Sequence, residues 1–309
     1  MHTLQIVIPS RVRLLSLVAG AALLSASAAV AQVAPAETGK ANSRANAERI
    51  VSLGGDATEI LYALGLQDRI VAVDSTSIEP PEALKSKPNI GYMRQLSAEG
   101  VLSTGATIIV ANAQAGPPEV VAALKNANIK YLELPGNESS NNIAEKVRVV
   151  GKAFGVTKHA SELAGRIESG FKVLAARRQT ITAPAKVIFV LGVNNGRATI
   201  GGKATTANTM IELAGGINAA AGLNGYKPLT DEALLALKPD VVLTMRREGT
   251  TDSVTLIGSL PGYKLSPAGK LGRLIEMDAG YLLAFGPRTH EAARELMAKL
   301  YPALAKQDN

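Results

Sequence analysis

The sequence contains no cysteine and no tryptophan, and aromatic residues make up only 4% of its 309 residues. Without cysteine the chain has no disulfide framework, no thiolate metal ligand, no cysteine nucleophile and no cysteine to carry an N-terminal lipid. Histidine is almost as scarce. Of the three histidines, His2 lies at the very start of the chain, and His159 and His290 are too few to build a metal site by themselves.

The chain is basic. It contains 33 lysine and arginine residues and 26 aspartate and glutamate residues, which gives a formal net charge of +7. A basic balance suits an anionic partner without naming one. The charged residues are scattered along the sequence and aromatic residues are few, so the pattern argues against a nucleic-acid partner.

The first thirty residues have the pattern of an export signal. Arg11 and Arg13 give a positive region, 14–28 is a short apolar run, and Ala29-Val30-Ala31 has the small residues that a signal peptidase requires. The apolar run is shorter than the roughly 20 residues of a membrane-spanning helix, so a retained membrane anchor is only the alternative. We expect cleavage after this motif, a periplasmic mature protein and no stable membrane insertion.

The mature chain begins with the pattern of a parallel βαβ unit. The apolar run 50–53 is followed by two glycines, and Asp56 or Thr58 is expected to cap a helix that Gly65 ends. A second apolar run, 70–73, forms the next strand. Strand, helix and strand with glycine at the turns indicate an α/β protein.

Two segments far apart in the sequence resemble each other. Residues 96–102 lead into an apolar strand at 107–111, and residues 229–235 lead into one at 240–244. In both, a serine or threonine is expected to cap a short helix, a glutamate follows two positions later, and a Gly-Tyr pair comes before the segment. The repetition predicts two lobes of similar α/β build.

The most helical part of the sequence lies between these repeats. Residues 142–154 form an amphipathic segment ended by Gly155, and Thr157 is expected to cap a second helix that runs to about Arg178 before Pro184. At 1.5 Å per residue the second helix would be roughly 30–36 Å long, the length of a domain. A helix of this length between lobes permits only small rocking.

We therefore predict an α/β fold of two Rossmann-like lobes joined by a long rigid helix, with the ligand cleft between the lobes. One continuous α/β domain is the alternative. The predicted division is a signal peptide at 1–31, a disordered leader at 32–46, an N-terminal α/β lobe at 47–140, an interlobe helix at 141–180 and a C-terminal α/β lobe at 181–309.

Four segments, 49–65, 90–100, 214–218 and 225–229, carry a resemblance to a known family. They resemble the solute-binding proteins of ABC importers for metal chelates, the helical-linker class that includes vitamin B12 and siderophore binding proteins. Within that class the sequence is most similar to the haem-uptake branch (HmuT/ShuT-like proteins). The resemblance implies a monomeric carrier without enzymatic activity, which binds haem and delivers it to a permease and its ATPase in the inner membrane.

The most specific part of the resemblance is Gly-Tyr-Met-Arg before Leu-Ser-Ala-Glu. It implies that Tyr92 is an axial ligand of haem iron and that Arg94 supports it. A phenolate oxygen suits ferric iron, and a nearby guanidinium favours the anionic form of a phenol. Residues i and i+2 of an extended loop point the same way, so Arg94 is expected beside Tyr92. The alternative is a packed tyrosine and a solvated arginine.

Haem also has two propionates and a broad apolar face. Arg246 and Arg247, at the end of a predicted strand of the second lobe, are candidates to meet a propionate, and Tyr226 to stack on the ring or bind a propionate. The alternatives are rim charges and a structural aromatic residue. Some relatives have a histidine iron ligand in the loop after the first strand of this lobe. Residues 192–196 contain none, which argues against a His/Tyr pair and a stacked pair of haems.

Glu99 and Glu232 occupy matching places in the two repeats. The resemblance implies that they pair with arginines of the permease, and one carboxylate on each lobe would suit a two-fold permease dimer. The alternative is that both are ordinary first-turn acids favoured by the helix dipole.

Two other functions remain open beside the haem carrier. A siderophore or corrinoid carrier of the same fold would need no protein ligand to the metal. An exported enzyme ranks last, because the glycine pair at 54–55 lacks the G-x-G-x-x-G spacing and no Ser-His-acid arrangement is legible.

Overall fold

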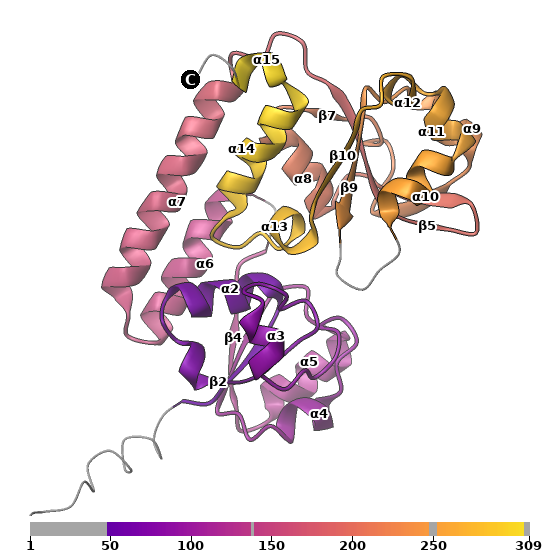
Figure 1. The fold of residues 1–309 in the computed structure, drawn as a ribbon. Helices are drawn as coiled ribbons and strands as arrows, with labels where there is room; N and C mark the ends of the chain where they lie inside the picture. The colour runs from indigo at the N-terminus through magenta and orange to yellow at the C-terminus, as the bar shows by residue number, and fades with distance from the viewer. Residues whose placement is uncertain (1–47, 137–138, 247–251, 306–309) are drawn as a thin grey trace, which may run out of the picture. The chain divides into compact units, whose positions relative to one another are not determined.

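Two β-sheets organise residues 48–136, 139–246 and 252–305, the parts of the chain that the computed structural model describes (Figure 1). Both sheets belong to one unit, Ala47–Asn309. The predicted signal peptide and leader, at 1–46, lie outside the described residues.

The first sheet has four parallel strands in the order β2-β1-β3-β4. Every residue of β1 and β3 is buried, as expected of inner strands covered on both faces. The strands predicted from the apolar runs are confirmed. Their bounds are Ile50–Leu53 for β1, Ile70–Val73 for β2 and Ile108–Ala111 for β3. The fourth strand, β4 at Lys130–Glu133, was not predicted.

Helix α2, Gly55–Ala63, follows β1 directly. Its N-cap is Gly54, whose φ of 121° is a conformation that residues with a side chain rarely adopt, and no side chain caps the helix. The predicted cap at Asp56 or Thr58 is therefore wrong. The predicted end is confirmed, since Gly65 has a φ of 73° just beyond the helix. The other helices of this lobe are η1 at Gln67–Arg69, α3 at Glu82–Ser86, α4 at Ala98–Leu102 and α5 at Pro118–Asn126.

The second sheet is mixed, with the order β10-β9-β5-β6-β8 and β7 paired with β5. Strands β5 and β6 form an antiparallel hairpin over Asn195-Gly196, and both turn residues have a positive φ, as a two-residue hairpin requires. The segment 192–196, expected as a loop, is the end of β5 and this turn. The bounds are Lys186–Asn194 for β5, Arg197–Gly201 for β6, Ile217–Asn218 for β7, Tyr226–Leu229 for β8, Val241–Arg246 for β9 and Leu274–Asp278 for β10.

Short helices surround the second sheet. The predicted caps of the repeated segments are confirmed on both lobes, because Ser97 caps α4 and Thr230 caps α9 through their hydroxyl oxygens. The helices of this lobe are α8 at Thr206–Leu213, α9 at Asp231–Ala236, α10 at Ser253–Ser259, α11 at Pro261–Leu265, α12 at Pro267–Lys270, α13 at Ala279–Leu283, α14 at Thr289–Leu300 and α15 at Pro302–Ala305.

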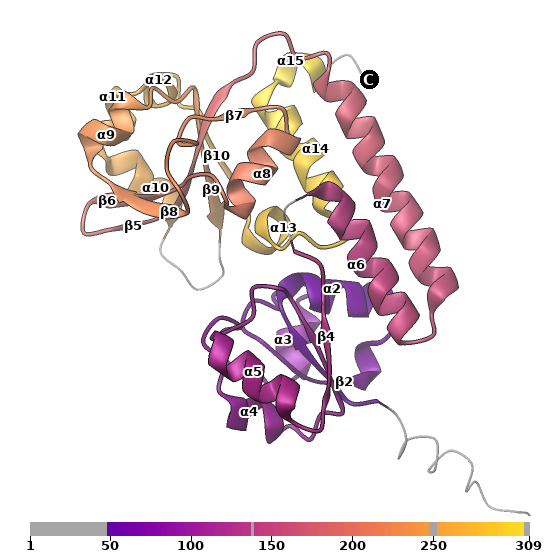
Figure 2. The ribbon, with the colours of Figure 1, turned by 180° about the vertical axis from the view of Figure 1, so that it is seen from behind.

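Two helices lie side by side along one flank of the lobes, α6 at Ser140–Ala153 and α7 at Thr157–Arg178 (Figure 2). Helix α7 is about 33 Å long and ends where predicted. It begins at Thr157 with Val156 as its N-cap, so the predicted threonine cap is wrong. Helix α6 contacts α2, whereas α7 contacts α8 and α14. The two sheets are thus connected through a packed pair of helices.

One hydrophobic core runs through this pair into both lobes. It joins Ile50 of β1, Val150 of α6, Ile167 of α7, Val187 of β5 and Leu296 of α14. Among the described residues, no helix is both long and apolar enough to cross a bilayer.

Candidate ligand-binding site

Tyr92 and Arg94 lie together in the loop between α3 and α4. The backbone N–H of Gln95 donates to the carbonyl oxygen of Tyr92 at 2.8 Å, so these residues form a turn and not the predicted extended loop. Nevertheless, Nη1 of Arg94 donates to the Tyr92 hydroxyl, and its Cζ lies 5.6 Å from the centroid of the tyrosine ring. The predicted pairing is therefore present, for a different geometric reason. Tyr92 is 38% exposed and Arg94 is exposed.

A buried carboxylate fixes the backbone of this loop. Asp74 follows β2 directly and is 0% exposed. It accepts hydrogen bonds from the backbone N–H groups of Gly54 at 2.8 Å, Thr76 at 2.9 Å and Met93 at 3.3 Å. The carboxyl ends of β1 and β2 are thereby tied to the residue between Tyr92 and Arg94. Sequence reasoning missed Asp74, although a polar residue at the carboxyl end of a parallel strand marks the edge where α/β ligands bind.

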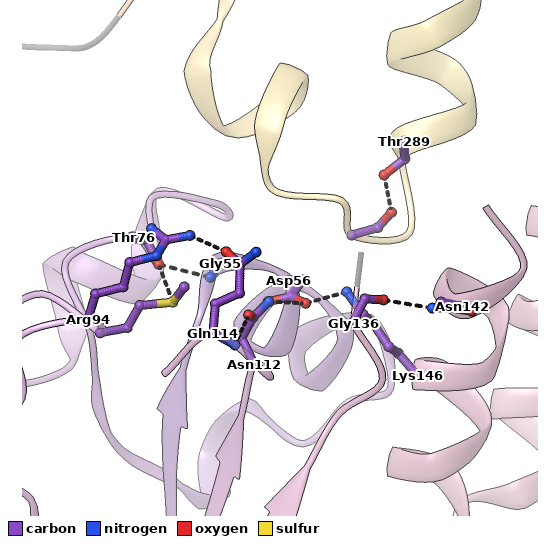
Figure 3. A network of polar contacts seen from close by, with 12 residues as sticks. Gly55, Asp56, Thr76, Arg94, Asn112, Gln114, Gly136, Asn142, Lys146 and Thr289 are labelled. Carbon is purple, nitrogen blue, oxygen red and sulfur yellow. Dashed lines mark hydrogen bonds and ion pairs between the residues drawn. The ribbon is translucent and has the colours of Figure 1, made fainter. Parts of the chain in front are cut away.

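Gln114, in the loop after β3, holds the other side of the Arg94 guanidinium (Figure 3). Nη2 of Arg94 donates to Oε1 of Gln114, and the backbone N–H of Gln114 donates to Oδ1 of Asn112 at 2.8 Å. The two loops are also joined by their backbones, since Gly116 N–H donates to the Met93 carbonyl at 2.9 Å. Gln114 was not predicted from the sequence.

The same network continues into α6. The Asn112 amide donates to Oδ2 of Asp56 at 2.8 Å, and Nζ of Lys146 lies 2.5 Å from that oxygen (Figure 3). Lys146 is 0% exposed and Asp56 is 1% exposed, so this is a fully buried ion pair. Asp56 therefore anchors α2 to α6 and does not cap its own helix.

Tyr226 opens β8 in the second lobe and is 37% exposed. Its ring meets the edge of Phe189, with the centroids 6.4 Å apart. Burial raises the pKa of Tyr226 and outweighs the hydroxyls of Thr206 and Thr205 and the charge of Arg94, which lower the pKa. The phenol is therefore neutral at pH 7. Because Arg94 and Tyr92 both act on this pKa, the three side chains lie within electrostatic reach of one another.

Arg246 ends β9, and its side chain is 67% exposed. Its Nη1 lies 3.7 Å from Oε2 of Glu276 on the neighbouring strand β10, a long and solvent-exposed ion pair that constrains it weakly. The structure brings it to Glu276 and gives it no described contact with Tyr92 or Tyr226. Arg247, the other predicted propionate partner, lies outside the described residues.

Glu99 and Glu232 are each the second residue of a short capped helix, α4 and α9, and both are exposed. The backbone N–H of Glu232 and the Thr230 hydroxyl hold the pKa of the Glu232 carboxyl below its usual value. That carboxylate is therefore fully charged at neutral pH. The matching positions expected from the repeats are confirmed.

The described residues contain no cluster that would hold a metal ion. No group of three or more His, Asp or Glu residues gathers within the described ranges in a way that would hold an ion. A cavity of about 630 Å³ lies between α7 and α14, and Arg177, Arg294 and Tyr301 are among its lining residues. Tyr92, Arg94 and Tyr226 do not line it.

Comparison with known proteins agrees with this architecture. Residues 50–281 match the family model described as periplasmic binding protein. Among solved structures, the periplasmic heme-binding protein RhuT from Roseiflexus sp. RS-1, in its apo form, is 38% identical with a TM-score of 0.77. The match covers 84% of this chain and 99% of that one.

Two curated relatives widen the comparison. The ABC transporter substrate-binding lipoprotein YvrC of Bacillus subtilis, itself uncharacterized, is 29% identical over 265 residues, 84% of this chain and 82% of that one. The cobalamin-binding protein of Halobacterium salinarum is 27% identical over 206 residues, 64% of this chain and 53% of that relative. The family model spans all the named strands of both sheets, from β1 to β10, and the names of these relatives describe a substrate-binding protein of an ABC transporter and a cobalamin-binding protein. The chain therefore belongs to the periplasmic binding protein family, as a two-lobed substrate-binding protein of an ABC importer.

Proposed function

We propose that this protein binds haem in the periplasm as a monomer and delivers it to a permease and its ATPase in the inner membrane. The observation that carries the proposal is the Tyr92–Arg94 pair, in which a guanidinium donates to an exposed phenol oxygen. The pair stands where the carboxyl ends of parallel strands meet, the edge at which α/β proteins bind ligands. The similarity to RhuT, a heme-binding protein, supports the same cargo.

The chemistry of the pair suits an iron ligand. Arginine can only donate hydrogen bonds, so the contact with Arg94 stabilises negative charge on the Tyr92 oxygen. A phenolate oxygen is a suitable axial ligand for ferric haem iron. The haem iron belongs to the cargo, and Tyr92 is the ligand that this protein contributes.

The propionates need partners on the second lobe. Tyr226 is a neutral phenol within electrostatic reach of Arg94, and we assign it as a hydrogen-bond donor to a propionate or as an aromatic surface for the ring. Arg246 has an exposed guanidinium whose ion pair with Glu276 is long, so we assign it as a partner of the second propionate. Arg247 remains a candidate from the sequence alone.

A corrinoid or siderophore carrier is the second candidate. The similarity to a cobalamin-binding protein favours it, although the match covers about half of that relative. In this function Tyr92 would make no bond to the metal, and its hydroxyl would be dispensable. Removing the Tyr92 hydroxyl, as in Tyr92→Phe, therefore distinguishes the two functions, because it should weaken the binding of haem and not that of a corrinoid or siderophore.

Haemin titration of the mature protein, beginning at Gln32, tests the proposal. We expect saturable binding near one equivalent and a high-spin ferric spectrum with a phenolate-to-iron charge-transfer band. Tyr92→Phe should remove that band. Tyr226→Phe is the matched control, which should keep the band and weaken binding about tenfold through the loss of one hydrogen bond to a charged group.

Weak, non-saturating association with the same spectrum in Tyr92→Phe would reject haem as the cargo. A saturable titration with cyanocobalamin would then support the corrinoid function.

The proposed export of the protein is tested by a separate measurement. The N-terminal residue of protein isolated from the periplasm should be Gln32, and an intact N-terminus there would reject cleavage after Ala31.

A further inference from the structure

The second lobe meets the first at another place besides the helix pair α6 and α7, where α13 lies close to α2 (Figures 1 and 2). Gly280, in α13, and Gly286, in the loop between α13 and α14, are buried and face side chains of the first lobe. A Cβ atom on Gly280 would lie 2.9 Å from Cγ1 of Ile78, and one on Gly286 would lie 2.8 Å from Cδ of Glu59. The lobes are therefore in close contact here, without room for an added methyl group.

One arginine closes this contact by binding two carboxylates of the first lobe. Nε of Arg288 donates to Oε1 of Glu59 at 2.8 Å, and its Nη2 lies 3.1 Å from Oε2 of Glu79. A guanidinium is a rigid planar fork, so two acceptors fix its position as well as its direction. Moving the lobes apart by about 1 Å at this point would take both contacts out of hydrogen-bond range.

Arg288 has a firm base on its own lobe. It follows a loop in which Phe285, 1% exposed, has a φ of 58°. A bulky residue keeps such a backbone conformation only where its surroundings hold it, and Phe285 belongs to the core that contains residues of α7 and β5. The Thr289 hydroxyl also donates to the Gly286 carbonyl at 2.7 Å. The loop is therefore packed into the second lobe, and the arginine cannot follow the first lobe outward.

The two acceptors are equally well supported on the first lobe. Glu59 lies in α2 and is 8% exposed, and Glu79 lies in the loop after β2. Asp74 begins that loop and binds the backbone N–H groups of Gly54, just before α2, and of Met93. The contact with Arg288 and the turn around Met93 thus share one support.

We propose that Arg288 is a lock between the lobes, which holds them at one separation and has to be released whenever they move apart. The helix pair alone permits the lobes to rock about their connection, and a second fixed contact removes that movement. The lock acts in the cargo-free protein and does not depend on which solute the protein binds.

The distance between the lobes measures the lock directly. Because the chain has no cysteine, Ala122→Cys in α5 and Ala236→Cys in α9, both at exposed positions, take spin labels at these two places only. Double electron–electron resonance at pH 7, without cargo, should give one narrow distance distribution. In Arg288→Met the mean should increase by about 2–4 Å and the width about twofold, because small changes at a packed contact are amplified into rigid-body movements.

Two further variants make the test specific. Glu59→Leu with Glu79→Leu removes both acceptors at similar side-chain volume and should give the same increase. Arg148→Met is the matched control. Arg148 binds Glu168 at 2.8 Å, and its side chain is 41% exposed against 39% for Arg288, but its ion pair joins α6 to α7 and not the lobes. It should leave the distance unchanged.

The outcomes separate the lock from a merely stabilising ion pair. An unchanged distance in Arg288→Met, even with a lower melting temperature, would overturn the lock. An equal shift in Arg148→Met would also overturn it, because the loss of any arginine ion pair would then suffice. Since no cargo is present, a failed haemin titration rejects the proposed function and leaves this inference standing.

Discussion

The guanidinium of Arg288 lies 2.8 Å from the carboxylate of Glu59, although 229 positions separate the two residues. A second arm of the same guanidinium reaches Glu79 at 3.1 Å, and its face covers the ring of Tyr281. Glu59 belongs to α2, whereas Arg288 immediately precedes α14. An ion pair therefore ties the C-terminal part of the chain directly to the first lobe. Burial raises the pKa of Glu59, and this effect exceeds the lowering by Arg288.

This ion pair predicts how stability depends on pH. Between the ordinary carboxyl pKa of 4.5 and the raised value of Glu59, the folded protein binds more protons than the unfolded chain. The contribution of Glu59 to the free energy of unfolding is therefore fully present below pH 4.5 and falls as pH rises through the folded pKa. Without its cationic partner Glu59 should titrate at still higher pH. Arg288→Met should accordingly cost about 1–2 kcal/mol at pH 7 and less at pH 5.

Urea unfolding at the two pH values measures this difference. Glu59→Gln is the control, because it removes the titrating group and should flatten the dependence across the same window. An equal cost of Arg288→Met at pH 5 and pH 7 would contradict the titration of Glu59.

The buried pair of Asp56 and Lys146 predicts a large loss of stability when one partner is removed. Lys146→Met leaves a carboxylate that is 1% exposed without its ammonium group, and we expect a cost of about 3–5 kcal/mol. Lys125→Met is the matched control. Its ion pair with Glu133, at 2.6 Å, is about half exposed and should contribute less than about 1 kcal/mol. Similar costs in urea unfolding would show that burial does not govern the two pairs.

Helix α6 passes α7 at a glycine. A Cβ atom on Gly151 would lie 2.1 Å from the Cβ of Ala160, so Gly151→Ala should force the helices apart and cost about 1–3 kcal/mol. Gly165, within α7, has open space where its Cβ would be, and Gly165→Ala should stabilise the protein by about 0.5–1 kcal/mol. Thermal unfolding of the two variants should shift in opposite directions. A stabilised Gly151→Ala protein would mean that the helix pair is less tightly packed than its geometry requires.

We propose that Glu99 and Glu232 dock the protein onto the permease, and a measurement on the reconstituted importer tests this. Replacing both with arginine should repel the arginines expected on the permease, while haemin titration of the free protein stays normal. We expect haem-dependent ATP hydrolysis by the reconstituted importer to fall at least tenfold. Glu119→Arg, in the first turn of α5, is the control for an exposed charge reversal at a helix start. Undiminished hydrolysis with the double variant would reject the docking assignment.

Local patterns in the sequence were sufficient to predict helix caps and helix ends where residues close together in the chain determine the structure. The caps at Ser97 and Thr230 need only a hydroxyl placed before a helix, and the stop at Gly65 needs only a residue that tolerates a positive φ. The same reasoning failed at Asp56, because the buried lysine that binds it is 90 positions away. The hydroxyl of Thr58 likewise binds Ser52 and Ser77 at 2.7 Å each and does not cap the helix.

The residues of the candidate site also fall into two groups, those that a local motif predicted and those that only the fold brings together. Tyr92 and Arg94 are two positions apart, so a short motif was enough to associate them. Asp74 and Gln114 reach them only because parallel pairing aligns the ends of β1, β2 and β3, and no local pattern reports which loops then meet. A search for polar residues directly after each predicted strand would have found Asp74 and Asn112.

The core that runs from β1 through α6 and α7 to α14 has a consequence for how the protein loses its structure. Each lobe also has a smaller apolar cluster of its own, but the largest core is shared by both lobes and the helix pair, so heating should melt both lobes in a single calorimetric transition. A solute bound at the Tyr92 turn would then shield distant α14 from proteolysis as effectively as the turn itself. Cargo loading would in this way lengthen the lifetime of the entire carrier, by mass action alone.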